Sequence, residues 1–286
     1  MTEKRYSQTL WRRALLRFKR HKTGIVGGIL LLVFIFCAIF AEYISHYDPL
    51  AQNLEERLMP PSLKHPFGTD YAGRDIFSRI IYGTRISLTI GFISVSLALV
   101  VGTLLGASAG YIGGWWDILV MRLIDIMLAF PAVLLAIGIM AILGPKLTNA
   151  MIAVGIVSIP NYTRIVRATI LSIKNKDFVD AAKALGLKPI RILFRHILPN
   201  CLAPIIVQAT LGIASAILEA AGLSFLGLGA QPPTPEWGAM LSESRQYLRY
   251  APWTVFFPGF AIMALVLAFN LFGDALRDVL DPRYYR

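Results

Sequence analysis

The chain has 286 residues, of which 56% are hydrophobic and only 16% are charged. Soluble domains average about 25% charged residues, so the composition excludes an ordinary soluble domain and indicates a membrane-embedded chain. The net charge of +11 would suggest a nucleic-acid partner for a soluble protein, but here the basic residues gather in segments that flank apolar runs.

Uncharged runs mark the membrane spans. Each of six runs is about long enough to cross ~30 Å of hydrocarbon, which takes roughly 20 helical residues. They cover residues 23–41, 86–116, 126–145, 147–163, 197–218 and 250–273. The second run exceeds the length of one span, so its helix is expected over residues 86–109. The predicted fold class is an all-α membrane protein with six transmembrane helices.

Charge asymmetry predicts the orientation of the spans. Residues 1–22 form a basic arm with eight Lys or Arg against one acid. Such a segment stays in the cytoplasm and binds anionic lipid. Alternation then puts residues 42–85 outside, and the loop 164–200 and the tail 274–286 inside. The charge of this loop supports its cytoplasmic position, because residues 164–195 hold eight Lys or Arg and two acids. The first helix, 23–41, thus precedes a five-helix core, 86–273.

Two irregular segments are expected at the outer ends of the spans. Turn-forming and charged residues close the segment 42–85, and a proline-rich stretch follows the fifth span. Irregular backbone at this depth survives only when it is buried in protein or lines a water-filled space. We therefore expect an outer gate here, with the candidate residues Gly68, Asp70, Arg74, Asp75, Pro232, Pro233 and Trp237.

The inner loop contains a predicted short helix. Phe178, Val179, Ala182 and Leu185 fall on one face at 3.6-residue spacing, and Gly186 is placed to end the helix. An inner-face helix that is apolar on one side needs a partner to cover it. Further along, Pro199 fits the first turn of a new helix that leads into the fifth span.

Two carboxylates lie in or near the spans. Glu219 belongs to the fifth apolar helix, where an unpaired charge is costly, so such a residue usually faces a cavity or a partner. Glu219 is therefore either a pathway group or a structural hydrogen-bonding residue. Asp125 is expected to pair with Arg122 one turn before it, or to contact the basic loop.

Enzymatic motifs are missing from the sequence. It has no Gly-x-x-x-x-Gly-Lys-Ser/Thr phosphate loop and no His-Glu-x-x-His, and its four histidines are scattered. Cys37 and Cys201 are not placed for a disulfide or a metal site. We therefore predict no catalytic, cofactor-binding or metal site on this chain.

The inner loop resembles the "EAA loop" of prokaryotic ABC-importer permeases, which docks into a groove of the ATP-hydrolysing subunit. The match comprises Ala181, Ala182, Gly186, Leu198 and Pro199, with Asp180 in the position of the family's Glu. The resemblance implies an ATPase-coupling role for Phe178, Val179, Asp180, Ala181, Ala182, Leu185, Gly186, His196, Leu198 and Pro199.

Further motifs over about residues 65–286 resemble the permeases of dipeptide, oligopeptide and nickel importers. The motifs include 68–75, 121–131, 223–229, 232–241 and 273–283. The basic arm and the extra first helix are similar to the C-type permease of that group. Ile159 departs from the pattern, because relatives often have Trp there.

This resemblance implies a type I importer fold and a permease subunit that forms half of a pathway in the inner (plasma) membrane of a prokaryote. It implies as partners a second homologous permease, two ABC ATPase subunits that hold ATP and Mg, and an extracytoplasmic substrate-binding protein. The implied cargo is a di- or oligopeptide. Nickel chelates, glutathione or opines remain alternatives, as do an ion-coupled secondary transporter and a membrane scaffold without transport.

Overall fold

The computed structural model describes residues 18 and 21–280 of the chain. Within them the structure is helical, and the extended pairing is one isolated bridge between Thr69 and Asp75. The predicted all-α class is therefore confirmed. The predicted basic arm over residues 1–22 lies outside the described residues except for Phe18, His21 and Lys22, and so does the end of the tail after Leu280.

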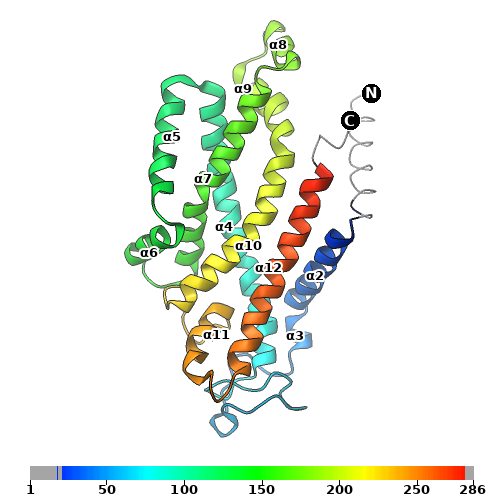
Figure 1. Ribbon diagram of the computed structural model, residues 1–286, viewed down its shortest axis with the longest axis vertical. Coiled ribbons are helices and arrows are strands. Elements are labelled where there is room, and N and C mark those ends of the chain that lie inside the picture. The colour runs from blue at the N-terminus through cyan, green and yellow to red at the C-terminus, as the bar shows by residue number, and fades with distance from the viewer. Residues whose placement is uncertain (1–17, 19–20, 281–286) are drawn as a thin grey trace.

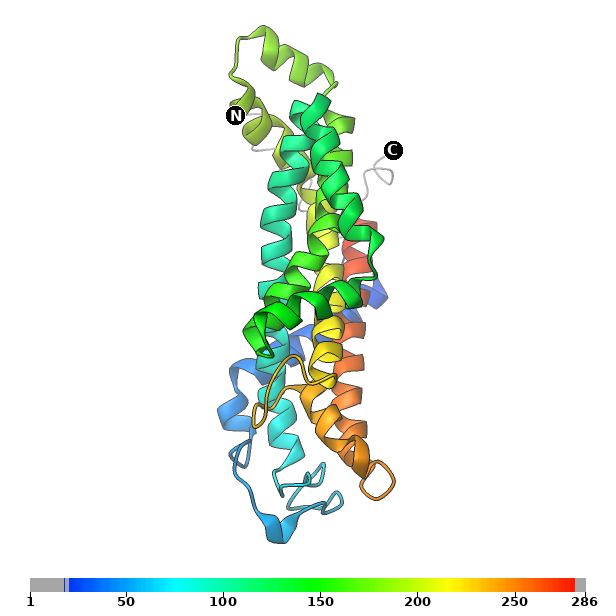
Figure 2. The same cartoon turned by 90° about the vertical axis from the view of Figure 1, so that its left-hand side faces the viewer.

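The long helices run side by side in an elongated bundle (Figure 1). At one end lies α8, and at the other end lie α11 and the segment that joins α3 to α4 (Figures 1 and 2). In chain order the helices are α2 (Lys22–Ile39), α3 (Ala41–Ile44), α4 (Ile76–Ile112), α5 (Gly114–Ala129), α6 (Ala132–Leu143), α7 (Leu147–Ile173), α8 (Asp177–Ala184), α9 (Pro189–Ile192), α10 (Leu202–Phe225), α11 (Trp237–Ser244) and α12 (Trp253–Leu280).

Four helices in the described part of the chain are long and apolar enough to cross a membrane. They are α2, α4, α12 and the helical stretch Pro189–Phe225, which ends in α10; the bent pair α5–α6 would make a fifth. Helix α7 has 27 residues, but Asn149, Asn161, Arg164 and Arg167 reduce its apolar character. Length and composition thus support several spans without establishing the predicted number of six.

The predicted third span, residues 126–145, is not a straight helix. The chain breaks between α5 and α6, and the two helices meet at a bend of 94°. Phe130 is extended, with φ −94° and ψ 139°, and Pro131 follows it. Proline lacks the N–H of a helical hydrogen bond and disfavours the helical conformation of the residue before it. The apolar run alone did not reveal this break.

The second span also begins earlier than predicted. Helix α4 starts at Ile76 rather than at residue 86, so the last ten residues of the predicted outer segment are helical. Asp75 sets this start because its side chain accepts a hydrogen bond from the backbone N–H of Ser78 at 2.8 Å, which is an N-cap. The prediction used uncharged runs, so the charged residues Arg79 and Arg85 excluded this part of the helix from the predicted span.

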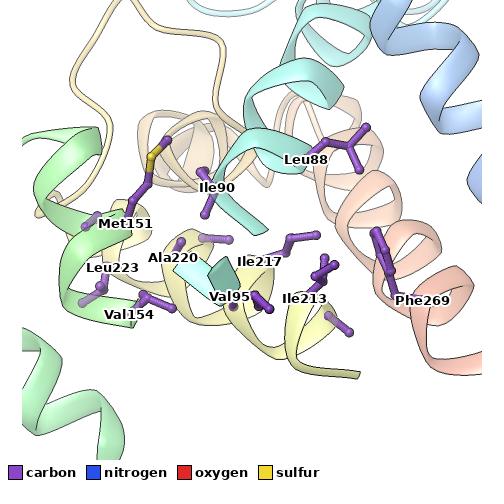
Figure 3. Packing of buried hydrophobic residues seen from close by; sticks show 14 of the residues in the cluster. Leu88, Ile90, Val95, Met151, Val154, Ile213, Ile217, Ala220, Leu223 and Phe269 are labelled. Carbon is purple, nitrogen blue, oxygen red and sulfur yellow. The ribbon is translucent and has the colours of Figure 1, made fainter. Parts of the chain in front are cut away.

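Helix α4 lies at the centre of the bundle, where glycines permit close contact. A Cβ atom on Gly102 would lie 2.6 Å from the Cβ of Tyr162, and one on Gly106 would lie 2.5 Å from the carbonyl oxygen of Thr163. Gly102 and Gly106, four residues apart, thus form a small-residue surface that packs against α7. On another face, Leu88 and Val95 pack with Ile213, Ile217 and Phe269 of α10 and α12 (Figure 3).

Candidate functional sites at the two ends of the helix bundle

Helix α8 is a short helix with a defined C-terminal cap. Asp177 and Asp180 lie in its first turn and Lys183 in its last turn, which suits the helix dipole. At its end, Gly186 has a φ of +71°. The N–H of Gly186 donates to Lys183 O at 2.9 Å and the N–H of Leu187 donates to Ala182 O at 3.2 Å, the two bonds of a Schellman motif. The predicted helix and its glycine stop are confirmed.

The apolar face of α8 points partly into the chain, contrary to the prediction that one continuous face awaits a partner. Val179 and Ala182 are buried, with 0% and 4% exposure. They belong to a small core that also contains Ile170 and Ile173 of α7, and Ile205 of α10. Because Phe178 and Leu185 lie about 100° or more around the helix from Val179, they remain outside this core.

A separate apolar surface is exposed at this end. We call it the α8 tip; it consists of Phe178, Leu185, Ile190 and Phe194, which are 41%, 80%, 66% and 52% exposed. Five exposed basic residues lie before, between and after these four in the sequence: Lys176, Lys183, Lys188, Arg191 and Arg195. Figure 2 shows α8 beyond the ends of α4, α5 and α7. Several large apolar side chains exposed within one short segment, with basic residues between them, fit a protein interaction site.

Sequence reasoning missed Ile190 and Phe194. Their spacing of four residues within a basic loop was the available signal, because two large apolar side chains at i and i+4 share a helical face. Conversely, the predicted residues His196, Leu198 and Pro199 lie beside the tip rather than on it. The carbonyl of His196 accepts from the side chain of Asn200 at 2.7 Å. His196 and Leu198 are half-buried, and Pro199 lies in the turn Leu198–Cys201 that leads into α10.

Ion pairs attach α5 to α7 near the same end. Arg167 forms two hydrogen bonds with Asp117, both at 2.5 Å. Arg164 donates to Asp125 at 2.6 Å, so Asp125 contacts the predicted basic loop rather than Arg122. Bidentate pairing of this kind fixes orientation as well as distance.

At the opposite end, a buried cluster joins the segment before α4 to α11. We call it the outer cluster; it contains Asp70, Arg74, Arg79 and Glu243. Arg74 donates to Asp70 at 2.6 Å and to Glu243 at 2.8 Å. Arg79 lies 3.6 Å from Asp70 and 3.8 Å from Glu243. Asp70 also accepts from the backbone N–H groups of Ala72 and Arg74. Arg74 and Arg79 are 1% and 0% exposed, so the cluster holds the fold at this end.

The other predicted gate residues are distributed unevenly. Asp75 is buried and lies 2.8 Å from His65 Nδ1. Gly68 is also buried and has a φ of +76°, and a Cβ there would lie 2.5 Å from Met59 O. Pro232 and Pro233 are exposed. The buried members cannot offer side chains to a docked protein, whereas the two prolines can.

Trp237 and Glu236 start α11 inside the protein. Trp237 is fully buried, and its indole N–H donates to Ile80 O at 3.2 Å. Glu236 accepts from the N–H groups of Gly238 at 3.0 Å and Ala239 at 2.8 Å, which caps the helix. Burial raises the pKa of Glu236 even though these hydrogen bonds favour its charged form.

Glu219 is half-buried on α10. Among the described residues its carboxylate has neither a hydrogen-bond nor an ion-pair partner. Gln208, Ser215 and Glu219 lie within about 40° of one another around the helix, next to the exposed Gly222. They form a polar stripe that the other helices of this chain leave at least partly uncovered.

These features define an integral membrane protein of several helical spans that exposes apolar side chains at one end. Comparison with known families makes the assignment specific. The chain belongs to the family described as the binding-protein-dependent transport system inner membrane component, whose model matches residues 102–286. Residues 9–61 match the N-terminal transmembrane domain of oligopeptide transport permease C. The predicted ABC-importer permease family is therefore confirmed.

Relatives cover almost the whole chain. It is 58% identical to the dipeptide transport system permease protein DppC of Alkalihalophilus pseudofirmus, over 96% of this chain and 90% of the relative. It is 51% identical to DppC of Haemophilus influenzae, over 93% and 92%. Identity to the glutathione transport system permease protein GsiD of Pectobacterium atrosepticum is 47%, over 96% and 92%.

A solved structure shares the fold. The inward-facing MetNI methionine ABC transporter matches with a TM-score of 0.59 at 18% identity, over 71% of this chain and 96% of the matched chain. At this identity the likeness shows the architecture alone. The chain is thus a multi-pass inner membrane protein with the fold of an ABC-importer permease.

Proposed function

We propose that this chain is one of two permease subunits of an ATP-driven importer that carries di- or oligopeptides. The α8 tip is the observation that carries the ATPase-coupling part of this proposal, because exposed apolar side chains on a short helix that is anchored by a small core fit a protein groove. The peptide cargo is supported by the names of the relatives, of which the dipeptide transport system permease protein DppC of Alkalihalophilus pseudofirmus is 58% identical to this chain.

The remaining partners follow from this role. ATP and Mg are held by two ABC ATPase subunits below the α8 tip, a second permease completes the pathway, and an extracytoplasmic binding protein delivers the cargo. Pro232 and Pro233, exposed at the opposite end, are candidate contacts for the binding protein. The membrane is crossed six times, with α5–α6 as a broken third span and α7 as the fourth, and both termini are cytoplasmic.

Motion passes from the tip to the membrane through the small core beneath α8. Val179 and Ala182 are packed with residues of α7 and α10, and closely packed side chains transmit displacement instead of absorbing it. A push on Phe178 or Leu185 therefore moves the ends of α7 and α10 together. The permease is the two-state element, and nucleotide on the ATPases biases it. Because Glu219 lies on α10, the same motion changes access to its polar stripe.

Glutathione is a second candidate cargo, favoured by the 47% identity to glutathione permeases. Uptake by the complete importer in proteoliposomes separates the candidates. The importer is oriented with its cytoplasmic side toward the vesicle interior. We expect ATP inside the vesicles, together with the binding protein outside, to drive accumulation of a labelled dipeptide. Accumulation driven by an ion gradient without ATP would identify a secondary transporter instead. Accumulation of glutathione but no dipeptide would replace the peptide assignment.

A further inference from the structure

A continuous groove follows α4 on its outward surface. It consists of three adjoining pockets of about 650, 610 and 470 Å³. The first and second share Arg85, and the second and third share Phe92 and Ile93. The groove thus extends from the junction of α3 and α4 down to Val101. We call it the α2–α4 groove, because Ile35, Ala38 and Ile39 of α2 form the second wall of its middle pocket, whereas the last pocket lies on α4 alone.

The groove changes from polar to apolar along its length. Its first pocket is lined by Glu42, Asp48 and Arg85 among others. The deeper pockets are lined mainly by aliphatic and aromatic side chains, including Ile35, Leu88, Phe92, Ile93 and Val100. From Arg85 to Val101 a helix rises by about 24 Å. One leaflet of a bilayer, with its headgroups, is about 20–22 Å thick. Length and polarity therefore match one phospholipid molecule.

The groove faces away from the helix that carries Glu219. Gly91 packs on Ile213 of α10, where an added Cβ would lie 2.7 Å from that side chain. The next residues, Phe92 and Ile93, are 51% and 47% exposed. Successive residues on a helix lie about 100° apart, so the groove lies on the flank and far side of α4 relative to α10. A surface turned away from the polar stripe of α10 suits contact with lipid.

Charge at the polar end selects the headgroup. Three N–H groups of Arg85 are engaged, with Ala38 O at 2.8 Å, Ile39 O at 3.2 Å and Glu42 at 3.3 Å. A guanidinium has five N–H groups, so two remain for a phosphate. The carboxylates of Glu42 and Asp48 line the same pocket and favour a cation next to that phosphate. An ammonium headgroup meets both requirements, whereas an uncharged glycerol headgroup adds no positive charge beside the two acids. Among the described residues, Glu42 pairs with Arg85 alone, and Asp48 accepts from the backbone N–H of Leu50 at 2.8 Å.

We propose that the α2–α4 groove binds one phosphatidylethanolamine molecule, with its phosphate at Arg85, its ammonium between Glu42 and Asp48, and one acyl chain along Phe92, Ile93 and Val100. The lipid belongs to the leaflet on the side of residues 42–75. Its function is to reinforce the junction of α2 and α4, which the hydrogen bonds from Arg85 to Ala38 O and Ile39 O already join.

Native mass spectrometry of the purified chain, with the subunits that co-purify, tests this proposal. The protein is stripped of bulk lipid in mild detergent and then offered equal amounts of phosphatidylethanolamine and phosphatidylglycerol. The first variant, Ser96→Trp, fills the pocket farthest along the groove from Arg85, which Ser96 lines. Its matched control is Leu104→Trp, on the same exposed side of α4 but beyond the groove. A second variant, Glu42→Gln with Asp48→Asn, removes the charges that select the ammonium.

We expect the unmodified protein to retain phosphatidylethanolamine in preference to phosphatidylglycerol. Ser96→Trp should lower retention roughly tenfold, the equivalent of about two chain methylenes left unburied, and Leu104→Trp should not. The double variant should reduce the preference by roughly three- to tenfold. Equal retention of the two lipids by the unmodified protein would overturn the proposal, and so would equal losses in the two Trp variants. A cysteine at Ile93 that crosslinks to a second permease subunit would also overturn it.

Discussion

Arg74 and Glu243 lie 169 positions apart in the chain, yet the guanidinium of Arg74 donates to the carboxylate of Glu243 at 2.8 Å. This contact ties the segment before α4 to α11. Both partners are shielded from solvent, with side-chain exposures of 1% and 13%. The sign and size of its contribution can be tested directly.

Arg74→Ala should destabilise the protein by about 3–5 kcal/mol, because it leaves the carboxylates of Asp70 and Glu243 buried with one cation fewer. Thermal unfolding of the purified chain measures this loss. Arg245→Ala is the control, since Arg245 is exposed on the same side of the molecule and should change stability by less than about 0.5 kcal/mol. Equal effects of the two variants would contradict a structural role for the outer cluster.

Leu185→Glu should separate the ATPase subunits from the permease or uncouple hydrolysis from uptake, with the membrane fold intact. Leu185 is 80% exposed, so a charge there disturbs a partner groove and little within the chain. Co-purification of the ATPase subunits and ATP-driven uptake measure the effect. Tyr43→Glu, at an equally exposed position on α3, should leave the ATPase subunits bound. Normal coupling in Leu185→Glu would remove the tip from the docking surface.

Ala182→Glu should unfold the tip itself, because Ala182 is 4% exposed and belongs to the core under α8. Loss of ATPase binding in this variant would therefore say nothing about direct contact. Limited proteolysis should show new cleavage between residues 174 and 200. Protection equal to that of the unmodified chain would show that Ala182 faces outward.

Gly186→Val should weaken coupling, whereas Gly186→Asn should be close to the unmodified protein. The φ of +71° at Gly186 costs a side chain roughly 1 kcal/mol, and most for a β-branched residue. Asn tolerates this conformation better than other residues. Stimulation of ATP hydrolysis by cargo-loaded binding protein measures coupling. If both variants fail equally, the side chain is excluded by a partner surface and not by the backbone.

Glu219→Gln should leave the subunits assembled and lower uptake, because a carboxylate that has no partner among the described residues is available to the pathway. Size-exclusion profiles measure assembly and proteoliposome uptake measures transport. Ser242→Ala, on α11, serves as a control outside the polar stripe. Dissociation of the subunits in Glu219→Gln would instead assign Glu219 a structural contact with the second permease.

A cysteine at Lys188 should react with an impermeant thiol reagent only from the cytoplasmic side, and one at Gln231 only from the outside. Both positions are exposed, and the charge asymmetry of the chain predicts their sides. Cys37 is replaced by Ser in this experiment to remove background labelling. Labelling of both positions from the same side would contradict the six-span topology.

The sequence by itself determined the class of protein, the presence of membrane helices and the end of the short helix α8. Long uncharged runs require helices in a membrane because lipid offers no partner for backbone N–H and C=O groups. Gly186 fixed the end of α8, and the spacing from Asp180 to Pro199 indicated a docking loop. These features depend on local chemistry, which a single sequence carries in full.

Only the tertiary structure decided which faces those helices use. Val179 and Ala182 follow the same helical pattern as Phe178 and Leu185, but contact with α7 and α10 buries the first pair and leaves the second exposed. The sequence predicted Asp70 and Arg74 as outer-gate residues. In the structure they are buried, and Arg74 pairs with Glu243, which is distant in sequence. Burial of a side chain depends on contacts between segments that are distant in the sequence, and the local spacing of residues does not predict those contacts.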